Sequence, residues 1–471
     1  METPTSTVHD YSVIEKADMH LGHSSSGLLL PGIDPATRLE ASRLCARDVL
    51  ENHVFFNERQ FHNHLIHHLL ATFSMGASAE RLQQIFDVNK PIQRPSVDCS
   101  DKVIITTDNI WDHLSQEEYY PGYVAFFKAE LAGAGDEWKS VATRYFLDPR
   151  ALSMTMSGLF HPLILFGYGL EFESRVITVM ALAQGFVHRV AFNSILVPET
   201  FKEICSNSAA PNMAEKGASL WKIIRAMRVD PLASKLSFDD TPYSLTNSTI
   251  PEDLAIKYAK MWHVEASETS VNKKYAELLS VIAHIYGSVS RPGYAMVFEF
   301  AIMHLLTSVY FLPIIFDALT VDQRAVLLHA HSVQVLVLFA AVGCPELYLT
   351  AKEPADVVAS LEACSLEDKQ TNPWFAVFEK AIASNDMHVA KVVRALWRGS
   401  IISAFAEDMP ETESYELPPP VNWLRIAQDT VDVITASSFE DKEKQIQEGK
   451  RTWVRGMIAF DEFWSKYGEK I

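Results

Sequence analysis

Three long stretches of the chain are apolar and free of charged side chains, and they limit the fold more than any other feature. They span Ala151–Leu170, Phe300–Phe316 and Ala325–Pro345, and none contains Asp, Glu, Lys or Arg. A membrane-spanning helix needs about 20 predominantly apolar residues. Each stretch, however, is interrupted by His, Gly or Pro. We therefore interpret them as buried helices in the core of a large protein, with no membrane insertion.

The rest of the chain also has helical periodicity. From Ala36 onward apolar residues recur every three or four positions, whereas strand-like alternation is scarce and "KVIITT" at 102–107 is its best candidate. This pattern predicts an all-α fold, a large bundle-like domain with long buried helices. The expected helices lie near 37–53, 58–74, 121–133, 151–170, 174–194, 213–227, 251–263, 270–288, 294–318, 321–342, 373–398, 422–437 and 448–467.

Turn-forming and proline-rich segments suggest how the chain is divided. Residues 1–35 contain "GHSSSG" and "LPGIDP" and are expected to be poorly ordered. The main helical, catalytic domain then runs over 36–406. The segment 407–421 is an acidic, proline-rich surface loop, and 422–471 form a C-terminal helical pair packed on the main body.

Charge and cysteine content exclude several classes of function. The formal net charge is −18, and both nucleic acid and anionic membranes require a basic footprint. The five cysteines form no CxxC pair, which argues against zinc ribbons, iron–sulfur clusters and disulfide frameworks. The first twenty residues lack the basic and apolar regions of a signal peptide. A reducing, cytoplasmic location is expected.

Familiar cofactor and nucleophile motifs are missing from the sequence. It has no GxGxxG after an expected strand, no GxxxxGK[ST] and no GxSxG. An all-α enzyme without such motifs often takes its reactivity from a metal or cofactor held between helices.

The segment "FHNHLIHHLL" (61–70) contains four histidines. On a helix each residue advances by about 100°, so His64 and His68 are about 40° apart and their imidazoles converge on one point. His62 and His67 point elsewhere and are interpreted as packing or outer residues. HxxxH occurs in helical metal sites, but four histidines in a short segment also produce such a pair by chance. Metal binding and ordinary core packing both remain open on this segment alone.

Further histidines lie in apolar surroundings on other expected helices. They are His161, His284, His304, His329 and His331. A bundle core can collect ligands from facing helices. Carboxylates are scarce near these histidines, where only Glu171, Glu299 and Asp317 occur. An imidazole-dominated site suits iron, copper or zinc rather than magnesium or calcium.

Five ordered blocks of the sequence resemble the questin oxidase-like family of fungal polyketide pathways. They are "FHNHLIHHLLATFSMGAS" (61–78), "GLFHPLILFGYGLEF" (158–172), "FEFAIMHLLTSV" (298–309), "VGCPEL" (342–347) and "HVAKVVRALW" (388–397). The resemblance implies an oxidoreductase of secondary metabolism that opens an anthraquinone ring to a benzophenone, with a small polyketide as its substrate.

Some members of this family are understood as nonheme iron dioxygenases with four histidines and a carboxylated lysine on Fe(II), and with O₂ as co-substrate. Matching by motif implies the ligands His64, His68, His161 and His304, with a CO₂-derived carbamate on Lys391. Helical periodicity instead predicts that Lys391 is exposed, because it lies off the apolar arc of its helix, which is formed by Val389, Val392, Val393 and Leu396. His388 and Lys380 are the alternative fifth ligands.

The sequence identifies the residues of the substrate pocket less clearly than the metal ligands. Phe166, Tyr168 and Phe172 are candidates to line a flat aromatic pocket, although they serve equally well as core residues. Leu165 departs from the family, in which many members have a second histidine at this position.

Two other functions compete with the iron dioxygenase. Family members were long described as NADPH-dependent Baeyer–Villiger oxidases, so a monooxygenase acting on the same substrate class, with NADPH as reductant, is one alternative. A non-enzymatic helical binding protein with core histidines is the other. Iron content, bound flavin and dependence on O₂ distinguish the three.

Overall fold

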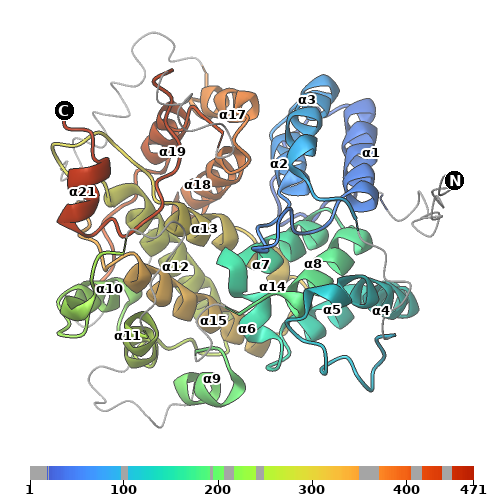
Figure 1. Ribbon diagram of the computed structural model, residues 1–471, viewed down its shortest axis with the longest axis horizontal. Coiled ribbons are helices and arrows are strands. Elements are labelled where there is room, and N and C mark those ends of the chain that lie inside the picture. The colour runs from blue at the N-terminus through green and yellow to red at the C-terminus, as the bar shows by residue number, and fades with distance from the viewer. Residues whose placement is uncertain are drawn as a thin grey trace, which may run out of the picture.

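The computed structural model describes residues 19, 21–96, 104–190, 195–205, 217–239, 249–348, 371–404, 416–437 and 448–471. These residues form α-helices and short 3-10 helices, and beside them only four isolated β-bridges occur in the described ranges. The all-α prediction is confirmed. Figure 1 shows the helices gathered in one body, with α7 (Ser157–Glu171) and α13 (Phe300–Val309) near its middle.

The remaining helices surround these two. In the first half of the chain they are α1 (Pro35–Glu51), α2 (Leu65–Ser74), α3 (Ala79–Asn89), α4 (Tyr120–Gly133), α5 (Trp138–Phe146), α6 (Leu152–Thr155) and α8 (Arg175–Val187). In the second half they are α9 (Pro198–Cys205), α10 (Leu220–Arg228), α11 (Ile250–Ala259), α12 (Glu268–Ser288), α14 (Leu312–Phe316), α15 (Val321–Ala341), α17 (Trp374–Ala383), α18 (Val389–Ala404), α19 (Trp423–Val433) and α21 (Asp461–Tyr467). Short 3-10 turns occupy Lys90–Ile92, Glu117–Tyr119, Gly135–Glu137 and Ala233–Lys235.

The three apolar stretches form the centre of the core, as predicted. They become α6 with α7, α13 with α14, and α15, and nearly all of their residues are buried. Among the described residues, α15 alone has the length and apolar composition of a membrane span, and 89% of its apolar window is buried inside the protein. Packing against neighbouring helices therefore accounts for its hydropathy.

Helix starts follow local capping rules. Asp34 accepts a 3.0 Å hydrogen bond from the backbone N–H of Thr37 at the start of α1. Thr320 and Gln323 form a reciprocal capping box at α15. These side chains satisfy backbone donors that a helix leaves unpaired in its first turn, so the sequence determines where these helices begin.

Two expectations about the ends of the chain change. Of the N-terminal segment expected to be poorly ordered, residues 21–30 lie against the core, because Leu21 and Leu28 are buried and the Leu28 N–H donates to Glu171 and Tyr310. At the other end, α19 packs on α17 and α18, but the second C-terminal helix is confined to Asp461–Tyr467. Residues 405–415 and 97–103, which include parts of the predicted loop and strand, lie outside the described residues.

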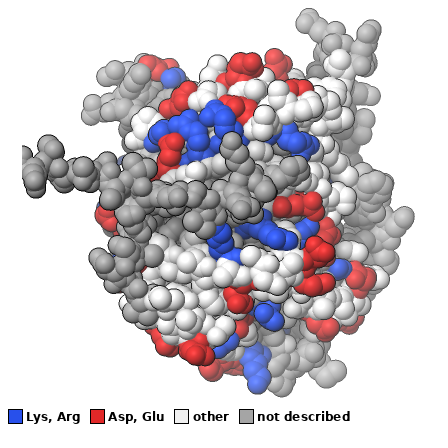
Figure 2. Space-filling model, turned by 90° about the vertical axis from the view of Figure 1, so that its right-hand side faces the viewer, with Lys and Arg blue, Asp and Glu red and all other residues white. Residues whose placement is uncertain are grey.

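Charged residues lie on the surface largely as neighbours of opposite sign. On the face shown in Figure 2, which carries α1, acidic and basic side chains are interspersed among the described residues. Several of those on α1 form ion pairs, such as Arg43 with Glu40 and Arg47 with Glu51. Such exposed pairs contribute little to stability, about 0–1 kcal/mol each.

Candidate metal centre

Four helices enclose a cluster of histidines. Helix α2 packs against α7, α7 against α13, α13 against α18, and α18 against α2, so that the four form a closed ring. His64 lies at the start of α2, His161 on α7, His304 on α13 and His388 immediately before α18. All four side chains are buried within this ring.

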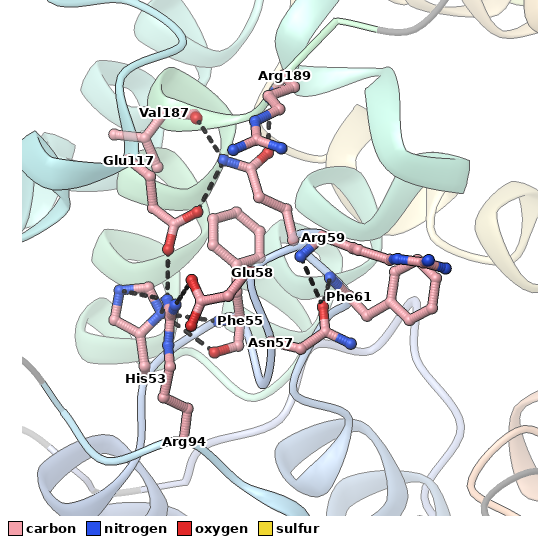
Figure 3. Close-up of polar contacts among 11 residues, drawn as sticks. His53, Phe55, Asn57, Glu58, Arg59, Phe61, Arg94, Glu117, Val187 and Arg189 are labelled. Carbon is pink, nitrogen blue, oxygen red and sulfur yellow. Dashed lines mark hydrogen bonds and ion pairs between the residues drawn. The ribbon is translucent and has the colours of Figure 1, made fainter.

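His64 is positioned by the loop that precedes α2 rather than by a helix. The sequence predicted a helix from about residue 58, but α2 begins at Leu65 and His64 is its N-cap residue. The Asn57 side chain accepts hydrogen bonds from the N–H groups of Arg59 and Phe61, which closes a tight turn (Figure 3). This turn overrides the helical periodicity of the segment, because Asn competes for backbone donors.

The same loop is fastened to neighbouring elements. Gln60 donates to Glu117 and to the Val187 carbonyl, and accepts from the Arg189 N–H at 2.9 Å. Glu117 in turn pairs with Arg94, so an ion pair braces the loop from the other side (Figure 3). The loop therefore holds His64 in a fixed position although no helix surrounds it.

A left-handed turn delivers His161. Gly158, Leu159 and Phe160 have φ values of 57°, 54° and 64° within the first turn of α7. Left-handed conformations cost a non-glycine residue roughly 1–2 kcal/mol, so this turn stores strain beside the cluster. It brings the His161 ring over its own backbone, where Nδ1 donates to the Gly158 carbonyl at 2.5 Å.

All four imidazoles are oriented in the same way. Each Nδ1 atom contacts a hydrogen-bond acceptor: the His62 carbonyl at 2.6 Å for His64, the Gly158 carbonyl for His161, the Phe300 carbonyl at 2.7 Å for His304, and the Asp386 carboxylate at 3.2 Å for His388. A proton on Nδ1 leaves Nε2 of a neutral ring with a free lone pair.

The Nε2 atoms face one another. Nε2 of His64 lies 2.8 Å from that of His161 and 3.2 Å from that of His388. Ring nitrogens of His64, His304 and His388 lie within 4.8 Å of one another, and Nε2 of His304 has no hydrogen-bond partner. Lone pairs converging in this way fit a bound cation, and an all-imidazole donor set suits iron, copper or zinc.

Electrostatics keep these rings neutral. Burial lowers the pKa of His64, His161 and His304 well below the usual value, and the nearby charge of Lys391 lowers it further. Burial lowers the pKa of His388 to about 4. Neutral imidazole is the form that binds a metal, so the rings are ready to act as ligands at neutral pH.

Lys391 is buried beside the histidines, contrary to the periodicity of its helix. Its side chain is 2% exposed and Nζ has no hydrogen-bond partner. Burial lowers its pKa to about 7. The same helix face also buries Arg394, which pairs with Glu171. The apolar arc predicted that this face of α18 is exposed. In the structure the face is buried, because Arg394 pairs with Glu171 and Lys391 lies beside the histidines. Lys380, by contrast, is exposed and pairs with Asp432 at 2.5 Å.

The structure does not bring His68 into the cluster. Its ring is fully buried, its two nitrogens have no hydrogen-bond partner, and it lies near Arg81, Asp386 and His388; burial lowers its pKa to about 3. The predicted pairing of His64 with His68 assumed that both lie on one helix. His64 is instead the N-cap residue of α2, with φ of −103° and ψ of 3°, although its carbonyl still accepts the His68 N–H at 2.9 Å. His388, the alternative ligand, occupies the position expected of a fourth histidine.

Two further histidines flank the cluster. His62 stacks on His161 with ring centroids 3.7 Å apart, and its Nε2 lies 2.8 Å from Nε2 of His188. His67 lies between His161 and Tyr168, with centroids 6.0 Å and 5.3 Å away, and neither of its nitrogens has a partner. Both rings therefore contact members of the cluster, and their role as outer residues stays a prediction.

The three candidate pocket aromatics differ in their relation to the cluster. Tyr168 stacks on His67, whereas Phe166 stacks on Phe146 at 4.2 Å and Phe172 contacts Phe73. All three are buried, as is Leu165. Tyr168 therefore contacts a histidine that flanks the cluster, whereas Phe166 and Phe172 pack elsewhere in the core, the latter also against His23.

The fold and the site together define an all-α protein with a polyhistidine centre buried between four helices. The model of the questin oxidase-like family matches residues 61–396, which include every histidine of the cluster and Lys391, and the chain belongs to that family. The predicted family membership is thus confirmed.

Individual relatives cover most of the chain. The oxidoreductase AflY of Aspergillus parasiticus is 26% identical over 437 residues, covering 88% of this chain and 83% of that protein. A questin oxidase of Aspergillus terreus is 26% identical, covering 88% and 89%. The Baeyer-Villiger oxidase mdpL of Emericella nidulans is 28% identical, covering 83% and 86%. The chain is accordingly an oxidoreductase of the oxygenase type, which confirms that prediction and sets aside the non-enzymatic alternative.

Proposed function

We propose that this protein is a nonheme iron dioxygenase that opens the ring of an anthraquinone to give a benzophenone. His64, His161, His304 and His388 would hold Fe(II), and a carbamate on Lys391 would complete the ligand set. The observation that carries the proposal is the convergence of the imidazoles: each Nδ1 is held by an acceptor, and the Nε2 atoms lie within a few ångströms of one another.

Lys391 supports an anionic fifth ligand. No Asp or Glu side chain is among the clustered metal-ligating groups of the described residues. A lysine forms a carbamate when its neutral amine attacks CO₂ and releases a proton. Burial lowers the pKa of Lys391 to about 7, so a far larger share of its amine is neutral near pH 7 than in an ordinary lysine.

The residues of this chain would orient the reactants. Fe(II) supplies the capacity to bind O₂ and to transfer electrons, which zinc lacks. The four helices bury the imidazoles, and Tyr168 stacks on the His67 ring beside them, with centroids 5.3 Å apart. We propose that a planar polycyclic phenol such as a reduced anthraquinone stacks on these aromatic rings.

A second candidate is an NADPH-dependent Baeyer–Villiger monooxygenase acting on the same class of substrate. The name of one relative, the Baeyer-Villiger oxidase mdpL, favours it. In that reaction one oxygen atom enters the substrate as an ester oxygen, and NADPH with a proton reduces the other to water. Hydrolysis of the resulting lactone then takes its second oxygen from water.

The two reactions differ in the origin of the product oxygens. We would purify the protein without chelators, measure iron and flavin, and carry out turnover under ¹⁸O₂ of a reduced anthraquinone and, separately, of the oxidised anthraquinone with NADPH. About one iron per chain and two ¹⁸O atoms in the benzophenone acid support the dioxygenase. One ¹⁸O atom, with stoichiometric NADPH consumption and no dependence on iron, supports the monooxygenase instead.

A further inference from the structure

The ligand His388 is oriented differently from the other three histidines. Backbone carbonyls hold His64, His161 and His304, whereas a carboxylate, that of Asp386, accepts from Nδ1 of His388. The same carboxylate oxygen accepts the backbone N–H of His388 at 2.8 Å. Asp386 is 1% exposed, so its charge acts in a site that water does not screen.

A residue from the C-terminal segment holds Asp386 in turn. Nε1 of Trp453 donates to Oδ1 of Asp386 at 3.0 Å, and the indole is 2% exposed. Trp453 lies beyond residue 396, where the match to the family ends. The contact therefore links the candidate centre to a part of the chain outside the range that the family model matches.

The backbone around Trp453 is fixed to the helix that carries another ligand. Val454 N–H donates to the Phe298 carbonyl at 3.0 Å, and Phe300 N–H donates to the Val454 carbonyl at 2.8 Å. Phe300 is the first residue of α13, and its own carbonyl accepts from Nδ1 of His304. Arg455 also lies over the Phe300 ring, 4.2 Å from its centroid. The C-terminal segment thus contacts the supports of both His304 and His388.

We infer that Asp386 and Trp453 are positioning residues of the metal centre, and that the C-terminal segment around Trp453 helps to hold its ligands in place. The inference rests on the metal of the proposed function. A carboxylate behind a ligating histidine fixes its tautomer and ring orientation and raises its basicity, and the loss of such a partner typically weakens metal affinity by 10–100-fold. Trp453 acts one step further out, by holding the carboxylate in place.

Metal affinity tests the inference without depending on catalysis. We would load the full-length protein and its Asp386→Asn and Trp453→Phe variants with Co(II), and titrate each with a chromophoric chelator while recording the Co(II) absorption bands. Asp386→Asn should weaken Co(II) binding by about 10–100-fold. Trp453→Phe, which keeps an aromatic side chain but removes the indole N–H and its hydrogen bond, should weaken it by about three- to tenfold. Both should shift the absorption bands.

Trp464→Phe is the matched control. Trp464 is equally buried and lies in the same C-terminal segment, but its Nε1 donates to the Ile458 carbonyl at 2.8 Å. This variant should lose similar folding stability and keep the wild-type Co(II) affinity. Circular dichroism and thermal unfolding of the apoproteins verify that each variant folds.

The possible outcomes separate the two proposals. If the wild type binds Co(II) tightly and the Asp386 and Trp453 variants bind it equally well with unchanged spectra, the positioning role is overturned while the metal centre stands. If Trp464→Phe weakens binding as much as Trp453→Phe, the effect is one of general stability and the inference also fails. A wild type that binds neither Co(II) nor Fe(II) overturns the proposed function and this inference together.

Discussion

The Nε2 atoms of His64 and His161 lie 2.8 Å apart, although 97 positions separate the two residues in the chain. Each ring contacts a backbone carbonyl through Nδ1, so in the neutral rings both facing nitrogens carry lone pairs. Two lone pairs at this distance repel each other unless a proton or a cation lies near them. The local folds at both histidines, a braced loop and a strained turn, therefore maintain an arrangement that a metal ion would stabilise.

The first prediction is that metal binding stabilises the protein through these rings. Because the ion binds only the folded state, Fe(II) at about 1,000 times its dissociation constant should add roughly 4 kcal/mol to the free energy of unfolding. His64→Ala and His304→Ala should each abolish this gain. Denaturant unfolding with and without Fe(II) under anaerobic conditions measures it, together with the metal content of each purified variant.

His68→Gln is the matched control for this experiment, because His68 is equally buried but lies outside the cluster. It should keep the metal content of the wild type. Loss of the metal in His68→Gln, with its retention in a His388→Gln variant, would restore the ligand pair expected from the sequence and would contradict the assignment of His388.

The comparison of His68 with His388 shows what periodicity can predict. The long apolar stretches identify the core helices and the all-α class, because burial imposes a 3.6-residue repeat. The same repeat predicts His68 as the partner of His64, whereas the ring nitrogens that lie nearest His64 in the structure belong to His161 and His388, and a tight turn held by Asn57 precedes His64. The residues that close a tight turn leave only a weak signal in the sequence. Hydrophobic periodicity also does not indicate which side chains from distant segments will come together in the fold.

Lys391 illustrates a different limit. The apolar arc of its helix predicted an exposed lysine, and only the family resemblance pointed to the site. In the structure α18 is buried on more than one face, and Arg394 on the same side pairs with Glu171 at a fully buried position. A prediction from an amphipathic pattern assumes that one face of the helix is exposed to solvent. Residues 389–396 of α18 are all buried and have no such face, so the charged residues in this part of the helix indicate polar contacts rather than solvent.

Lys391 should carry a carbamate that depends on CO₂. Protein exposed to ¹³C-labelled bicarbonate at pH 8 should show one carbamate signal in its ¹³C NMR spectrum, and removal of CO₂ should lower the metal affinity. Lys391→Ala should lose both the signal and most of the bound iron. Lys380→Ala, which removes an exposed lysine paired with Asp432, should change neither. A Lys391→Ala variant with full iron content would exclude the lysine as a ligand.

Gly158 should tolerate no side chain. Its φ of 57° disfavours other residues, and a Cβ there would lie 2.2 Å from Nε2 of His188. Gly158→Ala should therefore cost about 2–4 kcal/mol of stability, and should lower metal content by moving the carbonyl that orients His161. Gly133→Ala at the end of α4, where a Cβ meets no atom within 4 Å, provides a comparison that should remain within about 1 kcal/mol of the wild type. Equal stability of the two variants would contradict the steric argument.

The free energy of unfolding should fall as the pH falls below 6.5. Burial lowers the pKa of His331 in the folded protein to about 3, whereas the unfolded chain takes up the proton near 6.5. The unfolded state therefore binds more protons between these values, so this residue alone removes about 1.4 kcal/mol per pH unit on acidification. His331→Phe should reduce the slope of unfolding free energy against pH by an amount that approaches one proton near pH 5, as measured by urea titrations from pH 7 to pH 5. An unchanged slope would mean that His331 is protonated in the folded state.

His67 stacks on Tyr168, which we propose as a substrate contact, but its buried ring nitrogens should destabilise the fold. Both of its ring nitrogens are buried without partners, which costs roughly 1–3 kcal/mol for each unsatisfied group. His67→Phe keeps the stacking on Tyr168 and removes these polar atoms, so it should leave the protein as stable as the wild type or more stable. If the nitrogens bind the oxygens of the anthraquinone, the same variant should raise KM by tenfold or more while the iron content stays constant. His67→Asn should recover part of the affinity, because its amide restores a hydrogen bond. Wild-type kinetics in His67→Phe would show that the ring only fills space.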